Sequence, residues 1–301
     1  MPRLSVIVPS TADEAALERT LVSVLESRDR GVEVLLPHAD SYHDPYGLDG
    51  DEVRVLSVRG DASAAELINR GIEAASAEVV QVLLPGTSVR AGWSTAVLAA
   101  FADPRVAAVA AAVEEGGRGH AAIGLRGSQL PRRQGVLPIE TAEHAFPFLS
   151  GGYFRRGLLR SLGGLMAELP LGVAEVELAL ALQTLAVPIL RYAEPAVATD
   201  AAFEPTLGYQ EGQALGRVTA AYAAHEASPI QIDGLSVRMG RLAAGLFHPA
   251  SIAHRLGWTF GLQDRSLLQE VRGRVESASQ AWQEHLEAAE AAEYRSLRRA
   301  A

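Results

Sequence analysis

The sequence predicts an α/β protein with a mostly parallel sheet that is covered by helices on both faces. Short apolar runs rich in β-branched residues alternate with segments that carry apolar side chains at helical spacing. Prolines, glycines or polar turns end most of the apolar runs. Strands that alternate with helices in this way usually form a parallel sheet that is buried on both sides.

The order of these segments also predicts how the chain is divided. Strands are expected at residues 4–8, 32–36, 53–58, 79–84 and 106–113. Helices are expected at residues 14–26, 64–77, 92–101, 155–162 and 173–185, and a long irregular connection at 114–138. Beyond residue 206 the strand signal disappears, so we expect a main domain at 1–205 and a helical extension at 206–301.

Composition excludes several classes of function. A formal net charge of −9 over 301 residues argues against a dedicated nucleic-acid-binding protein. The chain has no cysteine, which excludes thiolate nucleophiles and cysteine-ligated metals. All 27 basic residues are arginine, so lysine Schiff bases and a P-loop lysine are excluded as well. Without a recognisable secretory leader or an apolar run of spanning length, we expect a cytoplasmic protein.

Three groups of residues at the ends of the predicted elements carry a family resemblance. They are LSVIVP at 4–9 followed by LERTL at 17–21, NRGI at 69–72, and GGYFRR at 151–156 leading to LGGL at 162–165. In order and spacing they resemble the family 2 glycosyltransferases, which have the GT-A fold. The resemblance covers residues 4–200. It implies transfer of a sugar from a nucleotide-diphosphate donor to an acceptor hydroxyl, usually with inversion and usually with Mg²⁺ or Mn²⁺.

The donor is expected at the strand ends, because ligands of such sheets bind beyond the carboxyl ends of the strands. Pro9, Ser10 and Thr11 follow the first strand, where hydroxyl groups or backbone amides can meet a nucleotide. An ordinary helix cap is the alternative for these residues. Asn69 matches the family's donor-binding region, and capping is the alternative for it too.

Two acidic elements of the family are missing. The segment after the second strand reads Pro37-His38-Ala39-Asp40 in place of an acidic pair, and Asp40 is expected to substitute from a shifted position. Where the family has Asp-x-Asp, this chain has Pro85-Gly86-Thr87, and Thr87 offers only a neutral oxygen to the donor. Mg²⁺ and Mn²⁺ prefer carboxylate oxygens, so no metal site is predicted although the family usually uses one of these ions.

Without a metal, arginines would have to neutralise the diphosphate. Guanidinium groups bind phosphate oxygens in pairs, and Arg155, Arg156 and Arg90 are the candidates by position. The alternative is that they are ordinary surface arginines.

Glu175 is the candidate general base. It matches the family's catalytic aspartate approximately, and it is expected near the start of an apolar helix. Stabilisation of the carboxylate by the helix dipole is the alternative explanation for its position. Glu177 points to a different side of the helix and is the substitute base if the alignment is shifted.

The C-terminal region suggests two kinds of partner. Residues 237–274 combine arginines with aliphatic and aromatic side chains, which suits a helix that lies on the inner face of an anionic membrane. The alternative is that its apolar stripe packs on the main domain or on a second copy of the chain.

Two functions follow from these observations. The first is a sugar transferase that takes a nucleotide-diphosphate sugar and an acceptor that the sequence does not identify. The second is a noncatalytic descendant that binds a ligand or scaffolds a true transferase, and the missing acids favour it. An unrelated doubly wound binding domain is disfavoured, since no glycine-rich dinucleotide motif follows the first strand.

Overall fold

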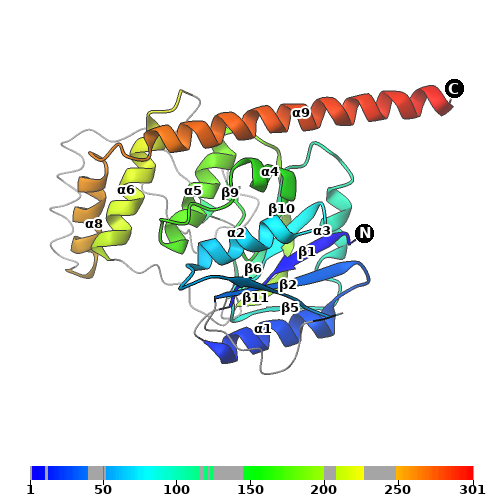
Figure 1. Ribbon diagram of the computed structural model, residues 1–301, viewed down its shortest axis with the longest axis horizontal. Coiled ribbons are helices and arrows are strands. Elements are labelled where there is room, and N and C mark those ends of the chain that lie inside the picture. The colour runs from blue at the N-terminus through cyan, green and yellow to red at the C-terminus, as the bar shows by residue number, and fades with distance from the viewer. Residues whose placement is uncertain are drawn as a thin grey trace.

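The computed structural model describes residues 2–10, 13–39, 50, 52–115, 118–120, 123–124, 145–199, 208–226 and 249–300. A central sheet has helices on both faces (Figure 1), which confirms the predicted α/β class. The main sheet contains β1 (Leu4–Ile7), β2 (Val32–Ala39), β3 (Arg54–Val58), β4 (Val79–Val82), β5 (Thr87–Val89), β6 (Ala108–Glu115), β7 (Arg118–His120), β10 (Gly152–Arg155) and β11 (Ile189–Thr199). A separate pair is formed by β8 (Ile123–Gly124) and β9 (Ala145–Phe146). The helices are α1 (Glu14–Ser27), α2 (Ala64–Ala74), α3 (Thr95–Ala100), α4 (Arg156–Ser161), α5 (Leu171–Thr184), α6 (Tyr209–Ala223), α8 (Pro249–Gly261) and α9 (Leu268–Ala300).

The strand order places a topological switch point beside β1. The order is β3-β2-β1-β4-β10-β6-β11-β5, with β7 paired to β6. β1 is parallel to both β2 and β4, so the chain leaves β1 on one side and returns on the other. Ligands of open α/β sheets bind beyond the strand ends at such a point. The carboxyl ends of β1 and β4 are therefore where a site is expected.

β10 is a strand that the sequence did not predict. It runs antiparallel to both β4 and β6, so β6 and β11 point in the same direction as β4. All four of its residues are buried, and they lead directly into α4. A short run that is buried on both faces shows no alternation of apolar and polar residues, so periodicity does not identify it as a strand.

α1 and α2 cover opposite faces of the sheet (Figure 1). α1 begins at Asp13, whose carboxylate accepts an N–H of the first turn, and α2 begins with a capping box formed by Ser63 and Glu66. Gly71 brings α2 close to β1, because a Cβ at this position would lie 2.5 Å from the Ile7 side chain. The glycine of the NRGI motif thus serves helix–sheet packing.

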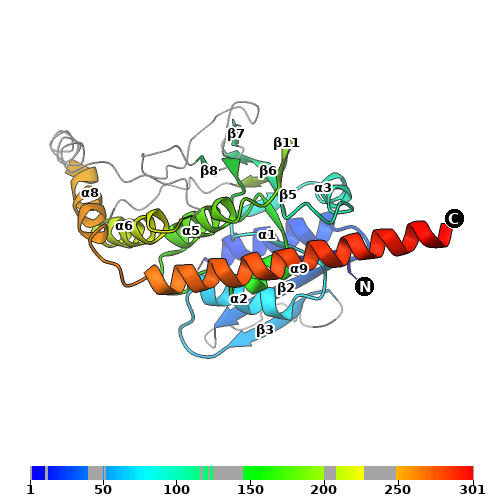
Figure 2. The same ribbon diagram turned by 90° about the horizontal axis from the view of Figure 1, so that it is seen from above.

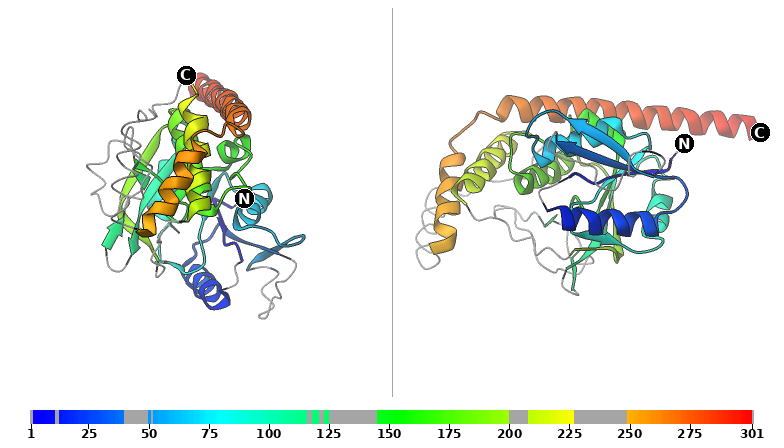
Figure 3. Two further views of the ribbon diagram at one scale, coloured as in Figure 1. Left: turned by 90° about the vertical axis from the view of Figure 1, so that its left-hand side faces the viewer. Right: turned by 60° about the horizontal axis from the view of Figure 1, so that its bottom comes forward.

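α6 and α8 pack with their backbones in contact (Figure 3). Each helix carries two glycines four residues apart, Gly212 and Gly216 on α6 and Gly257 and Gly261 on α8. A Cβ at Gly257 would lie 2.0 Å from the carbonyl oxygen of Tyr209. The two helices can approach this closely only because these side chains are absent.

α9 is one helix of 33 residues, and it contains the last residues of the basic segment 237–274. It lies across the body through a stripe of buried side chains, Val271, Val275, Ala278 and Trp282. Beyond this stripe it extends past the rest of the molecule (Figures 1 and 2). Across the described residues, none of the helices combines the length and the apolarity needed to cross a membrane.

The described C-terminal helices share one apolar core with the sheet. Trp258 and Leu262 of the expected amphipathic segment are buried in this core, as its packing alternative predicted. Leu256 and Phe260 of α8 remain exposed. The domain boundary at residue 205 stays a prediction.

Replacing Gly257 by alanine should lower the free energy of unfolding by about 1–3 kcal/mol, because the added methyl group overlaps the Tyr209 carbonyl and forces α6 and α8 apart. Gly273→Ala is the matched control. Gly273 is an exposed helical glycine of α9 with nothing within 4 Å of the added Cβ, so alanine should stabilise the protein by about 0.5–1 kcal/mol. Urea unfolding measures both variants, and equal effects would contradict the proposed helix contact.

Candidate functional site

The segments after β1 and β4 run side by side beyond the last residues of the two strands. The N–H of Leu83 donates to the carbonyl oxygen of Ile7 at 2.9 Å. On the other side, the N–H of Ser10 donates to the carbonyl oxygen of Pro37 at 2.9 Å. Pro9 is buried and Ser10 is half-buried. Both residues therefore lie at the switch point, as the sequence predicted.

A tight turn follows β4, where the resemblance predicted an acidic motif. The N–H of Thr87 donates to the carbonyl oxygen of Leu84 at 3.1 Å, with Pro85 in the second position of the turn. Gly86 holds the third position with φ of 88°. This is the pattern of a type II turn, which requires a left-handed residue where the glycine lies. The backbone conformation thus explains why glycine occupies position 86, the middle residue of the stretch that stands in place of Asp-x-Asp.

Thr20 of α1 fastens this turn to the body of the protein. Its hydroxyl oxygen accepts the N–H groups of Gly86 and Thr87 at 3.0 and 3.1 Å and donates to the carbonyl oxygen of Ala16 at 3.1 Å. The Thr87 side chain is itself buried, with 2% of its surface exposed. Both amide groups of the turn therefore bind α1, and the described contacts of Thr87 stabilise the turn.

A second loop connects the same edge to the predicted base. The N–H of Leu84 donates to the Ser150 hydroxyl at 3.4 Å, and the N–H of Leu149 donates to Oε1 of Glu175 at 2.8 Å. Glu175 is the fifth residue of α5, beyond its first turn, and has 3% of its surface exposed. The helix dipole acts mainly within the first turn, so the hydrogen bond from Leu149 explains the position of this carboxylate better.

Hydrogen bonds link the end of β4 to Glu175, which is far away in the sequence. The link passes from the end of β4 through Ser150 to the loop that holds the carboxylate. This link brings the loop that holds Glu175 to the carboxyl end of β4, the region where ligands of open α/β sheets bind.

Asn69 makes contacts that are internal to the fold. Its amide group donates to the carbonyl oxygen of Leu165 at 2.8 Å and accepts the N–H of the same residue at 2.7 Å. The side chain therefore pairs with the backbone of Leu165 as a neighbouring strand would. This ties α2 to the loop that precedes α5.

Arg155 is a buried arginine with 3% of its surface exposed. It donates to the carbonyl oxygens of Val106, Phe101 and Asp103 at 2.7, 3.0 and 2.7 Å and forms an ion pair with Glu78. Burial lowers the pKa of its guanidinium group, and the Glu78 charge opposes this shift. In this structure its donors are directed at the backbone of residues 101–106.

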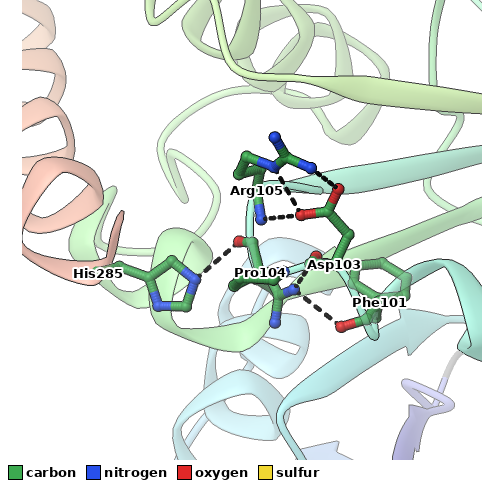
Figure 4. Close-up of polar contacts among 6 residues, drawn as sticks. Phe101, Asp103, Pro104, Arg105 and His285 are labelled. Carbon is green, nitrogen blue, oxygen red and sulfur yellow. Dashed lines mark hydrogen bonds and ion pairs between the residues drawn. The ribbon is translucent and has the colours of Figure 1, made fainter. Parts of the chain in front are cut away.

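The loop that Arg155 binds also meets α9. Figure 4 shows Asp103 paired with Arg105, at 2.8 Å, and the carbonyl oxygen of Pro104 beside the His285 ring. Nε2 of His285 lies 2.9 Å from that oxygen. The hydrogen bonds to Arg105 hold the pKa of Asp103 at about 2. This group of contacts joins the sheet to α9.

The other two candidate arginines differ in exposure. Arg156 is half-buried and donates to the carbonyl oxygen of Ala75 at 2.6 Å. Arg90 is 65% exposed and pairs with Glu114 at 2.6 Å. Glu114 lies near the carboxyl end of β6, which is at the same edge as the ends of β1 and β4. Arg90 is therefore the candidate whose guanidinium group remains in contact with solvent near the site.

Thr11 and Asp40 lie outside the described residues, as does the acidic segment that follows Asp40. Among the residues that are described, no group of three or more acidic or histidine side chains is placed to hold a metal ion. Leu84, Gly86 and Thr87 offer no carboxylate at the strand end. These residues do not fit Mg²⁺ or Mn²⁺, which require oxygen-rich coordination.

The sequence analysis did not identify Thr20 and Ser150, which hold the strand-end turn in place. The sequence does contain an indication of the role of Thr20, because it is a polar residue on the apolar face of α1 between buried Ala16 and Val24. Ser150 carried no signal besides its position before two glycines. The contacts of both residues join segments more than 60 positions apart, which local patterns do not show.

Asn69→Asp should lower the free energy of unfolding by about 1–3 kcal/mol, because the variant loses the donor to Leu165 and places a carboxylate oxygen against its carbonyl. Glu73→Gln on the exposed side of α2 is the control and should change stability by less than about 0.5 kcal/mol. Thermal or urea unfolding compares them. Unchanged stability of Asn69→Asp would argue against the clamp and for a direct role in ligand binding.

Comparisons with known proteins identify the fold. No protein-family model and no curated protein matches the chain. Among solved structures, S. aureus TarS 1-349 is similar with a TM-score of 0.58 and 11% identity, over 95% of this chain and 92% of that one. The same protein in complex with UDP-GlcNAc gives 0.57 and 12%, and in complex with UDP 0.52 and 12%, with the same coverage. The likeness confirms the expected GT-A-like fold, a curled sheet flanked by helices.

Proposed function

We propose that this protein binds a nucleotide-diphosphate sugar at the switch-point edge and transfers the sugar to an acceptor hydroxyl with inversion. The observation that carries the proposal is the position of Glu175, whose carboxylate is held at that edge by the loop preceding β10. The GT-A-like fold supports it, since the similar protein TarS has been crystallised with UDP and with UDP-GlcNAc. We further propose a divergent relationship to family 2, in which the Asp-x-Asp motif has been replaced.

In the proposed reaction Glu175 is the general base. The acceptor oxygen forms a bond to the anomeric carbon of the sugar while the bond from that carbon to the diphosphate oxygen breaks. The acceptor proton passes to Glu175, and the nucleoside diphosphate leaves with the electron pair. The N–H of Leu149 orients the carboxylate for this step.

The charge of the diphosphate needs a cationic partner, and we propose Arg90 for this role. Its guanidinium group is exposed at the edge, whereas Arg155 and Arg156 bind backbone carbonyl groups. Glu114 would have to release Arg90 or share it with the phosphate oxygens. Pro9 and Ser10 are proposed to line the nucleoside part of the site. The roles of Thr11 and Asp40 stay predictions, as do membrane contact and self-association through the C-terminal helices.

One observation favours a second function, binding without transfer. The described strand-end residues are Leu84, Pro85, Gly86 and Thr87, and the amide groups of the last two bind Thr20. A site with this neutral turn has lost groups that normally stabilise a leaving diphosphate. The protein would then bind a sugar nucleotide and act as a scaffold or regulator.

Calorimetric titration with UDP-GlcNAc and with GDP and TDP sugars tests the binding step. At least one donor should bind with a Kd below about 1 mM, and adding Mn²⁺ should leave the affinity unchanged, since the described edge lacks metal-binding carboxylates. Lack of heat with every donor at millimolar concentration would sink both functions. A large gain in affinity with Mn²⁺ would show that ligands outside the described residues complete a metal site.

Glu175→Gln tests the base. The amide oxygen can still accept the Leu149 N–H, so donor affinity should stay within about twofold, while transfer should fall by about 10²–10⁴-fold because the proton acceptor is lost. The control is Glu276→Gln on the exposed face of α9, which should transfer at the wild-type rate. Wild-type turnover in Glu175→Gln would remove this residue from the mechanism. Donor binding without transfer to any acceptor in the unmodified protein would favour the second function.

A further inference from the structure

A buried charged cluster connects three helices behind the candidate site. Glu177 of α5 is fully buried and accepts a hydrogen bond from the Tyr222 hydroxyl of α6 at 2.6 Å. Its other oxygen pairs with Arg274 of α9 at 3.1 Å. Burial raises the pKa of the Glu177 carboxyl above its ordinary value, and the Arg274 charge opposes this rise. Such a cluster is costly to bury, so it calls for an explanation beyond stability.

Arg274 makes a second contact that bears on the same helix. Its guanidinium group donates to the carbonyl oxygen of Gly164 at 2.9 Å, in the loop that leads into α5. The next residue, Leu165, is the one that Asn69 clamps. Arg274 thus bridges α5 itself and the loop before it.

The composition of α5 explains why this bridge matters. Nearly every residue from Val173 to Leu182 is buried, so the helix has apolar side chains on all sides. A helix with a single apolar stripe has one preferred rotation, whereas a helix that is apolar all round can repack in several rotations at similar energy. The two buried carboxylates, Glu175 and Glu177, are the polar groups whose partners distinguish these rotations.

The two carboxylates are coupled through the helix itself. They are two residues apart on one α-helix, and they point to different sides, toward Leu149 and toward Arg274. Any rotation of α5 that releases Glu177 from Arg274 also moves Glu175 relative to the Leu149 N–H. A contact made by the C-terminal helix can therefore determine where the proposed base lies.

We propose that Arg274 is a positioning residue: by holding Glu177 and the Gly164 carbonyl group, it fixes the rotation of α5 and places the Glu175 carboxylate at the candidate site. α9 then belongs to the functional architecture of the protein. The catalytic meaning of this role rests on the proposed function, but the geometric statement does not.

The test replaces the cluster by apolar residues of similar size, in the triple variant Glu177→Leu, Tyr222→Phe and Arg274→Met. Removing all three members leaves no charge buried without a partner, so the variant should keep an unfolding transition close to that of the unmodified protein. The position of Glu175 is read from amide hydrogen exchange at Leu149, whose N–H it binds. Exchange at Leu149 should become at least about tenfold faster, while the amides of β1, which report global unfolding, stay protected.

Arg272→Met is the matched control, because Arg272 lies on the exposed side of α9 and pairs with Glu276. It should leave Leu149 exchange unchanged. If the triple variant does not fold, Arg274→Lys serves instead, since lysine keeps the charge but lacks the planar guanidinium group whose Nη2 donates to both the Gly164 carbonyl oxygen and Glu177. It should accelerate exchange at Leu149 relative to the unmodified protein, while the amides of β1 stay protected.

Unchanged Leu149 exchange in a folded variant would overturn the proposal, and equal acceleration at Leu149 and in β1 would reduce the cluster to a purely structural role. If transfer is measurable, the variant should lose kcat with donor Kd unchanged. Failure of every sugar nucleotide to bind the unmodified protein would sink the proposed function alone, because the exchange measurement does not depend on a ligand.

Discussion

The parallel pairing of β1 with both β2 and β4 is the constraint on which the candidate site depends. β2 lies on one side of β1 and β4 on the other, so the chain crosses over to opposite sides of β1. The segments beyond the ends of β1 and β4 therefore meet at a topological switch point. The tight turn after β4 and the loop before β10 are both held against this edge. That loop carries the N–H that binds the Glu175 carboxylate.

The turn at residues 84–87 shows how a fold can be kept while its electrostatics change. A type II turn satisfies the backbone with Pro85 and Gly86, and Thr20 of α1 takes up the N–H groups that the turn exposes. The result is a strand end that is well ordered and neutral. A diphosphate bound at such a neutral strand end would need a cationic partner from another part of the protein.

Some of the arginines stabilise the fold and others lie on the surface. Their positions in the sequence did not distinguish the two groups. Arg155 is buried and Arg274 is half-buried, and both bind backbone carbonyl groups, where the planar guanidinium group can reach several acceptors at once. His285 joins the loop at residues 101–106 to α9 (Figure 4), and Arg274 joins α9 to the loop before α5. Arg90 remains at the solvent-exposed edge.

The sequence alone determined the fold class, the strands β1 to β4 and β6, and most of the helices, because these depend on local periodicity. It could not reveal β10, since a strand buried on both faces carries no alternating pattern. It also could not separate Arg155 and Asn69, which bind the backbone, from residues that face a ligand. Those roles were decided only by tertiary structure, because the partners of a buried polar side chain come from segments far away along the chain and are selected by packing.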